Sequence, residues 1–146
     1  MTKQERYGGR FDLNEVMKRF PETAPTMIMD EYVTDSKQVS TRVFRVYRSV
    51  PPHYHTQCDE VLYVMSGRGT FWIDDPMNES VFEPGHMIVF PRQAVHAIPS
   101  VLEEPVIFLA IDTPRRDPED VIFINPEDGD PRRFIRQIDA EKRSEG

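Results

Sequence analysis

The stretch His53-Tyr54-His55-Thr56-Gln57-Cys58-Asp59-Glu60, followed after six further residues by Gly67, carries most of the recognisable chemistry of this chain. It supplies two imidazoles and one carboxylate, and His96 offers a third imidazole downstream. Three imidazoles and one carboxylate suit a single divalent transition metal that keeps coordination positions open. The sequence therefore predicts a metal site, provided that these four side chains converge.

The spacing of the four donors indicates how they would converge. His53 and His55 are two residues apart, so both can face one side of a strand. Glu60 lies five residues beyond His55, an odd step that would turn it to the opposite side of an unbroken strand. We therefore expect the segment 56–59 to bend, so that Glu60 points inward again, and we expect His96 to arrive from a separate strand.

The rest of the chain has the pattern of an all-β protein. Turn residues recur about every 8–12 residues, which is typical of an antiparallel sandwich or barrel. A hairpin is expected around Ser66-Gly67-Arg68-Gly69. Pro51-Pro52 is expected to interrupt strand pairing just before the histidines. Strands are predicted at 26–33, 39–47, 61–65, 69–73, 80–83, 87–91, 95–98, 106–111 and 121–124.

Both ends of the chain have helical features. Asp12 can cap a short helix that ends before Pro21, with Glu15 in the capping-box position. Residues 131–142 are expected to form a second helix, whose apolar contacts would be Phe134, Ile135 and Ile138. We therefore expect three parts, an N-terminal helical extension (1–24), a β-barrel domain (25–125) and a partly helical C-terminal tail (126–146).

Composition restricts the class of protein. The 146 residues are 38% hydrophobic and 29% charged, which fits one globular domain. The net charge of −7 and the interspersed acids and bases argue against a nucleic-acid partner. Cys58 is the single cysteine, so no internal disulfide can form, and the apolar run 106–111 is too short to span a bilayer. The N-terminus has no apolar run typical of a signal peptide, so we expect a cytoplasmic protein without a membrane partner.

Two sequence motifs show a resemblance to a known family. The pattern His53-x-His55-x4-Glu60-x6-Gly67 resembles the first signature motif of the cupin superfamily, and Gly85-x5-Pro91-x4-His96 resembles the second. With their flanking strands the two motifs cover roughly residues 41–111. The resemblance implies a small single-domain cupin, with the double-stranded β-helix (jelly-roll barrel) of that family. It also implies that His53, His55, Glu60 and His96 are the metal ligands.

Three positions depart from the usual cupin motifs, and none of them is a ligand. Tyr47 stands where a glycine usually opens the first motif. Gln93 replaces the glycine that usually follows the proline of the second motif, and Ser100 replaces the asparagine that usually closes it.

The ligand set permits two uses of a bound metal. The first is a dioxygenase-type oxidoreductase acting on a small organic substrate, in a site lined by apolar residues such as Leu62 and Val64. The second is a metal-assisted isomerase, epimerase or lyase acting on a sugar or hydroxy acid. A non-catalytic small-molecule-binding cupin is the third hypothesis. The ligands accept Fe, Mn, Ni, Cu or Zn, so the sequence leaves the metal open.

Other residues carry more limited expectations. Arg45 and Tyr47 share one side of the strand that leads to the site, and they are candidates for binding an anionic substrate group. We expect His86 to be a solvated turn residue and Cys58 to be a small buried residue in the bend. Because unpaired strand edges favour association, we also expect a homodimer, with the strand at 26–33 as the contact.

Overall fold

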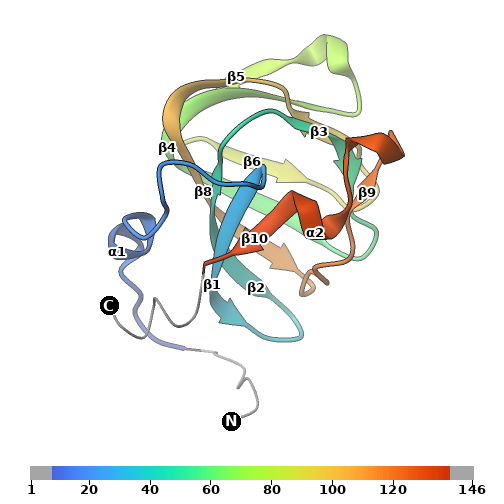
Figure 1. Ribbon diagram of the computed structural model, residues 1–146. Coiled ribbons are helices and arrows are strands. Elements are labelled where there is room, and N and C mark those ends of the chain that lie inside the picture. The colour runs from blue at the N-terminus through green and yellow to red at the C-terminus, as the bar shows by residue number, and fades with distance from the viewer. Residues whose placement is uncertain (1–7, 139–146) are drawn as a thin grey trace.

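The computed structural model describes residues 8–138, and strands that curl into a barrel account for most of them (Figure 1). The longest strand, β4 (Asp59–Ile73), belongs to both walls of the barrel. On one side of β4 the order continues through β8 (Val101–Thr113), β2 (Ser40–Val46) and β1 (Ile28–Asp35). On the other side it continues through β7 (His96–Ile98), β3 (Val50–Tyr54) and β9 (Ile122–Phe123). Two short strands, β6 (Met87–Phe90) and β5 (Ser80–Phe82), also pair with β4. This confirms the predicted all-β barrel.

Most predicted strands are present, with ends within two residues of the prediction, but the predicted hairpin at Ser66–Gly69 is wrong. β4 runs straight through these residues, and its register with β8 shifts repeatedly between Val64 and Gly69. The two glycines permit close approach of other segments. A Cβ on Gly67 would lie 2.3 Å from the carbonyl oxygen of Pro105, and one on Gly69 would lie 2.6 Å from that of Ser100. The glycines thus allow close packing against β8 and against Ser100, the residue before it. They do not reverse the chain.

The expected interruption at Pro51-Pro52 is a local irregularity inside β3. The strand begins at Val50 and includes both prolines, and its register with β7 shifts between Val50 and His53. A proline cannot donate a ladder hydrogen bond, so it fits best at such an irregularity. The strand therefore continues into the histidines and places His53 opposite His96 on β7.

The N-terminal helix is shorter than expected. α1 (Leu13–Met17) begins after Asp12, whose carboxylate accepts hydrogen bonds from the backbone N–H groups of Asn14 and Glu15, as the cap prediction required. Val16 and Phe20 are buried against the outer face of β2 and β8. Figure 1 shows α1 lying outside the barrel.

The predicted C-terminal helix is only partly correct. α2 (Pro131–Phe134) is one turn long, and the chain then enters β10 (Ile135–Gln137), which pairs in parallel with Ile28–Asp30 of β1. Residues 139–142 of the predicted helix lie outside the described part of the chain. Phe134 and Ile138 are buried, as expected for apolar contacts of this segment. Pairing of β10 with β1, and not a long helix, holds the segment in place. Two 3₁₀ turns, η1 (Pro76–Asn78) and η2 (Pro126–Asp128), complete the elements.

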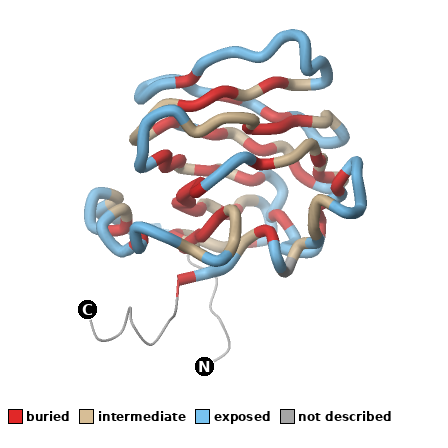
Figure 2. Tube along the Cα trace, turned by 45° about the horizontal axis from the view of Figure 1, so that its top comes forward, coloured by how far each residue is buried: buried red, intermediate tan, exposed pale blue. Residues whose placement is uncertain are grey.

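Buried residues follow the inside of the barrel, and a second apolar cluster lies on its outside (Figure 2). The inner cluster contains Phe44, Leu62 and Phe108, and the outer one joins Val43 and Ile107 to the residues under α1. Alternation along β2 explains the division, because Phe44 faces inward and Val43 faces outward.

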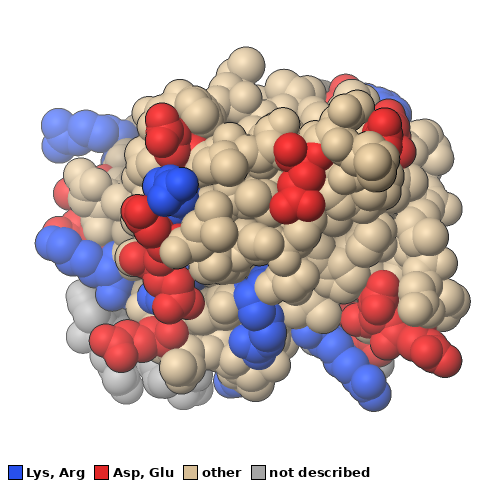
Figure 3. Space-filling model, turned by 90° about the horizontal axis from the view of Figure 1, so that it is seen from above, with Lys and Arg blue, Asp and Glu red and all other residues tan. Residues whose placement is uncertain are grey.

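The surface carries charges of both signs. On the face seen in Figure 3, acidic and basic side chains are interspersed among uncharged residues. Within the described residues, no helix has the length and apolar character needed to cross a membrane.

Two glycines with positive φ allow a matched test of the packing around β4. Gly67 (φ +83°) has the Pro105 carbonyl in the place of a Cβ, whereas Gly85 (φ +96°) has open space there. We expect Gly85→Ala to lower the free energy of unfolding by about 1–2 kcal/mol, the cost of positive φ alone. Gly67→Ala should cost about 2 kcal/mol more because backbone must also move. Urea denaturation of both variants measures the difference, and equal losses would contradict this account.

Candidate metal centre

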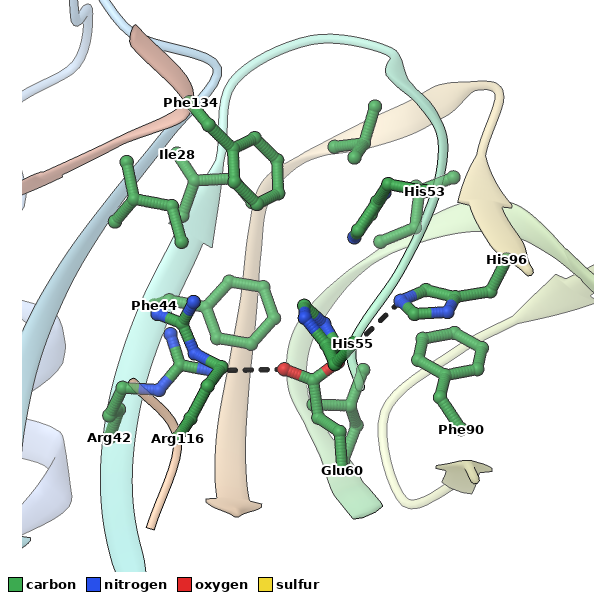
Figure 4. Close-up of a pocket in the computed structure, with 14 residues that line it drawn as sticks. Ile28, Arg42, Phe44, His53, His55, Glu60, Phe90, His96, Arg116 and Phe134 are labelled. Carbon is green, nitrogen blue, oxygen red and sulfur yellow. Dashed lines mark hydrogen bonds and ion pairs between the residues drawn. The ribbon is translucent and has the colours of Figure 1, made fainter. Parts of the chain in front are cut away.

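Three imidazoles meet inside the barrel. His53 lies on β3, His55 just beyond its end, and His96 at the start of β7, and all three are buried. One ring nitrogen from each lies within 4.8 Å of the others. Figure 4 shows the three rings facing a common space with Glu60 (Figure 4).

Backbone carbonyls fix the orientation of each imidazole. The Nδ1 atoms contact the carbonyl oxygens of Pro51 for His53 (2.8 Å), of Asp120 for His55 (2.7 Å) and of Ala94 for His96 (3.0 Å). A carbonyl oxygen can only accept, so Nδ1 must carry the proton in each ring. In the neutral imidazoles, Nε2 then keeps its lone pair. The Nε2 of His96 is buried and has no hydrogen-bond partner, which fits an atom placed to bind a metal.

Glu60 completes the group of donors. Its Oε1 lies 3.7 Å from Nε2 of His55 and 3.8 Å from Nε2 of His96. The predicted bend after His55 is present, and Glu60 is buried and faces the imidazoles. The three imidazoles therefore fit a divalent transition metal, and Glu60 lies beside them, outside the cluster whose donor atoms are all within 4.8 Å of one another.

Asp120 holds this bend in place from a distant loop. Its carboxylate accepts hydrogen bonds from the backbone N–H groups of Thr56 and Gln57 and from the Thr56 hydroxyl. Its backbone carbonyl accepts from Nδ1 of His55. Burial opposes ionisation of this carboxyl, but the bonds from Thr56 and Gln57 outweigh burial and lower the pKa of Asp120. One residue thus orients His55 and sets the course of the chain toward Glu60.

Burial keeps His53 and His96 in the neutral form that a metal requires. It lowers the pKa of His53 well below its usual value, and it lowers the pKa of His96 to about 4. Burial alone would raise the pKa of Glu60, but its buried neighbours, the Arg42 guanidinium among them, hold it well below its usual value. At neutral pH, Glu60 is therefore a carboxylate.

A fully buried arginine on β2 connects this site to three other strands. Arg42 on β2 contacts Asp112 on β8 through Nε (2.8 Å), Asp30 on β1 through Nη1 (3.2 Å) and Glu60 on β4 through Nη2 (2.9 Å). Asp30 and Asp112 are the diagonal neighbours of Arg42 in the sheet, two residues from its direct partners Tyr32 and Ala110. Arg42 shares the inward side of β2 with Phe44 and is buried there.

The donors line a small cavity with apolar walls. The cavity volume is about 20 Å³, enough for one or two small groups. The walls include Phe44, Leu62, Phe90, Ile98 and Phe134, and the guanidinium groups of Arg42 and Arg116 lie on the side away from His96 (Figure 4). Leu62 thus contributes to the apolar lining as expected, whereas Val64 is buried in the core and does not line the cavity.

Arg45 and Tyr47 do not line this cavity, so the prediction that they reach it is wrong. Both lie on the outward side of β2. The Tyr47 hydroxyl donates to the carbonyl of Pro21 (2.8 Å), and the Arg45 guanidinium donates to the same carbonyl and lies over the Tyr47 ring. The chain between α1 and β1 covers this face, so these polar groups bind backbone there.

The expectations for His86 and Cys58 are confirmed. His86 is an exposed turn residue whose Nδ1 accepts from the backbone N–H of Glu83. Cys58 is buried in the bend, and burial raises the pKa of its thiol to about 12, so the thiolate form is disfavoured. Gln93 adopts a φ of +70°, so it keeps the left-handed turn for which the second cupin motif usually has glycine.

Sequence comparison gives the same family as the motifs. A family model described as a cupin domain matches residues 43–112, which include all four donors. Residues 43–112 form a cupin domain. No curated protein matches the sequence significantly.

Solved structures show the same fold at low identity. A conserved protein with a double-stranded β-helix domain from Klebsiella pneumoniae is 15% identical, with a TM-score of 0.61 over 75% of this cupin and 92% of that chain. KdgF from a Halomonas species is 20% identical, with a TM-score of 0.55 over 62% and 82%. The polyketide cyclase RemF from Streptomyces resistomycificus is 21% identical, with a TM-score of 0.55 over 68% and 72%. At these identities the similarity establishes the fold alone.

Arg42 allows a test of the buried charge network. We expect Arg42→Met to lower the free energy of unfolding at pH 7 by about 3–5 kcal/mol, because three buried carboxylates lose their common partner. The pKa values of Asp30 and Glu60 should rise in the folded variant, which then binds more protons than the unfolded chain. The variant should therefore regain stability as pH falls from 7 to 5.

Arg48→Met is the matched control for this substitution. Arg48 is exposed and donates only to the backbone carbonyl of Ala24, so its removal should cost about 1 kcal/mol or less at either pH. Chemical denaturation at pH 7 and pH 5 measures both variants. A loss in Arg42→Met no larger than in Arg48→Met would contradict the network.

Proposed function

We propose that this cupin is a metal-dependent enzyme of the dioxygenase type that acts on a small organic substrate. One divalent transition metal, chosen among Fe, Mn, Ni, Cu and Zn, would be held by His53, His55, Glu60 and His96. The observation that carries the proposal is the orientation of the imidazoles. Each ring is tied at Nδ1 to a backbone carbonyl, and ring nitrogens of all three lie within 4.8 Å of one another inside one cavity.

A metal held by these four donors supplies Lewis acidity and open positions at which a substrate and dioxygen can bind together. The surrounding residues have distinct roles. Phe44, Leu62 and Phe90 exclude water and offer apolar contact to an organic substrate. Arg42 fixes one oxygen of Glu60, so only the other oxygen faces the imidazoles.

A metal-assisted isomerase, epimerase or lyase is the second candidate. It is favoured by the fold shared with the cyclase RemF, and by the ionised Glu60 beside the cavity, which could accept a proton instead of binding the metal. The third candidate, a non-catalytic small-molecule-binding cupin, would use the same four metal donors. Oxygen consumption separates the first candidate from the other two.

The metal site is tested by metal content. We expect purified protein, loaded anaerobically with Fe(II), to retain about one equivalent of metal after gel filtration. His55→Ala should lose most of that metal and remain folded, because the apolar core of the barrel does not include the ligand. His86→Gln is the matched control, since His86 is an exposed histidine outside the cavity, and it should bind metal like the wild type.

Retention of a full equivalent by His55→Ala would contradict the assignment of the ligands. Loaded protein is then mixed with oxygen and a panel of aromatic, diketone and hydroxy-acid substrates, with oxygen uptake as the measurement. Turnover of a hydroxy acid or sugar without oxygen uptake would replace the dioxygenase proposal by the Lewis-acid one.

We also infer a homodimer, although not through the strand at 26–33. Residues Ile28–Asp30 of that strand are already paired with β10, so the expected free edge is closed there. Large apolar side chains are instead exposed on the outer face of β4 and β6, where Tyr63 pairs with Met87 beside Val89. The small-molecule partner and the cytoplasmic location remain predictions.

Light scattering with a charge substitution tests the dimer. We expect the wild type to scatter as a dimer at micromolar concentration and Met87→Glu to scatter as a monomer. Met77→Glu is the control, because Met77 is 88% exposed in the η1 turn, away from the β4–β6 face. A monomeric wild type would contradict this inference.

A further inference from the structure

Arg116 is a buried cation whose side chain makes no hydrogen bond or ion pair with a carboxylate of the described residues, although its charge, from a greater distance, offsets part of the rise that burial causes in the pKa of Asp30. Its side chain is 2% exposed, and neither Nε nor Nη1 has a hydrogen-bond partner. Leaving buried guanidinium donors unpaired costs free energy, so native proteins normally satisfy them. Arg116 also lines the cavity beside Arg42, and Figure 4 shows its guanidinium near Phe44, across the cavity from the imidazoles.

The neighbouring carboxylates are committed to Arg42, except for one oxygen of Asp30. Asp112 and Glu60 contact Arg42, and so does one oxygen of Asp30. The second oxygen of Asp30 is buried without a partner, and no hydrogen bond joins it to Arg116. Arg42 is therefore saturated by protein groups, whereas Arg116 keeps donors for another anion.

The charge of the whole site points the same way. The two guanidiniums and a divalent metal carry four positive charges, against three negative charges on Asp30, Glu60 and Asp112. One further monoanion would bring the loaded cavity to neutrality, which matters in a space screened from water.

From these observations we propose that Arg116 binds the carboxylate of a small organic acid whose carbonyl or hydroxyl oxygen faces the imidazole cluster. This proposal rests on the proposed metal-dependent function and names its substrate class. The carboxylate is preferred to a phosphate because Arg116 is the one cavity-lining guanidinium of the described residues that keeps unpaired donors, and its planar fork matches a planar carboxylate. Arg116 takes the anion-binding role that the sequence assigned to Arg45 and Tyr47.

The adjacent arginine provides a matched control. Arg115 is partly exposed and pairs with Asp35 at the surface through Nε and Nη2. Because its donors are already used outside the cavity, Arg115→Gln should leave binding of an organic acid inside the cavity unchanged. Arg116→Gln removes the charge and keeps a polar side chain at the neighbouring position.

The test uses sodium glycolate as the probe and the Zn²⁺-loaded full chain. Calorimetry should show saturable binding to the wild type and to Arg115→Gln, with at least tenfold weaker binding to Arg116→Gln. Glycolamide, the uncharged analogue, should bind all three proteins weakly. Glycolate affinity for Arg116→Gln within twofold of the wild type would overturn the proposal, and so would tighter binding of inorganic phosphate than of glycolate.

A measurement on the wild type covers the case in which Arg116→Gln does not fold. In ¹⁵N-labelled protein, the Nε–H signal of Arg116 should shift saturably with glycolate, while that of Arg115 should stay in place. A shift confined to Arg115, or none at either residue, would overturn the proposal. Metal content separates this from the proposed function. If the wild type holds no metal, the proposed function fails, and the same titration of metal-free protein still decides whether Arg116 binds the acid.

Discussion

The contact of Arg42 with three carboxylates joins the fold of this cupin to its site. Its partners lie on β1, β8 and β4, which with β2 form consecutive strands of the sheet. A guanidinium has donors in a fixed plane, so the three acids can be satisfied together only if these strands keep their register. One of those acids is Glu60. The interaction that specifies the sheet therefore also specifies how the carboxylate donor is presented to the cavity.

A second constraint acts on the opposite wall. Histidine side chains rotate easily, and a metal site needs them held before the metal arrives. Here the chain uses its own carbonyl groups for this purpose, two from residues close in sequence and one from Asp120, far along the chain. Asp120 has a double role because its carboxylate also holds the bend that turns Glu60 inward. The loop before β9 is thus part of the site, although it contributes no ligand.

Local patterns in the sequence were sufficient for some of these features. Strand parity and the odd step to Glu60 predict the convergence and the bend, because both depend on residues near one another in the chain. The pattern at Ser66–Gly69 was misread because a glycine needed for close packing and a glycine needed for a turn look alike in one sequence. Arg42 could have been found, since it alternates with the apolar residues Phe44 and Val46. Asp120 and Arg116 carry no local signal, because their roles depend on contacts made only when distant segments fold together.

We propose that His53, His55, Glu60 and His96 together bind one metal ion. Anomalous diffraction from crystals grown with Zn²⁺ would detect that ion and show which residues bind it. We expect a single strong anomalous difference peak at the zinc edge inside the barrel. It should lie about 2.0–2.2 Å from a nitrogen of each of the three imidazoles and from an oxygen of Glu60. Imidazoles in the positions described here with no peak between them, or a zinc ion bound by other residues, would contradict this proposal.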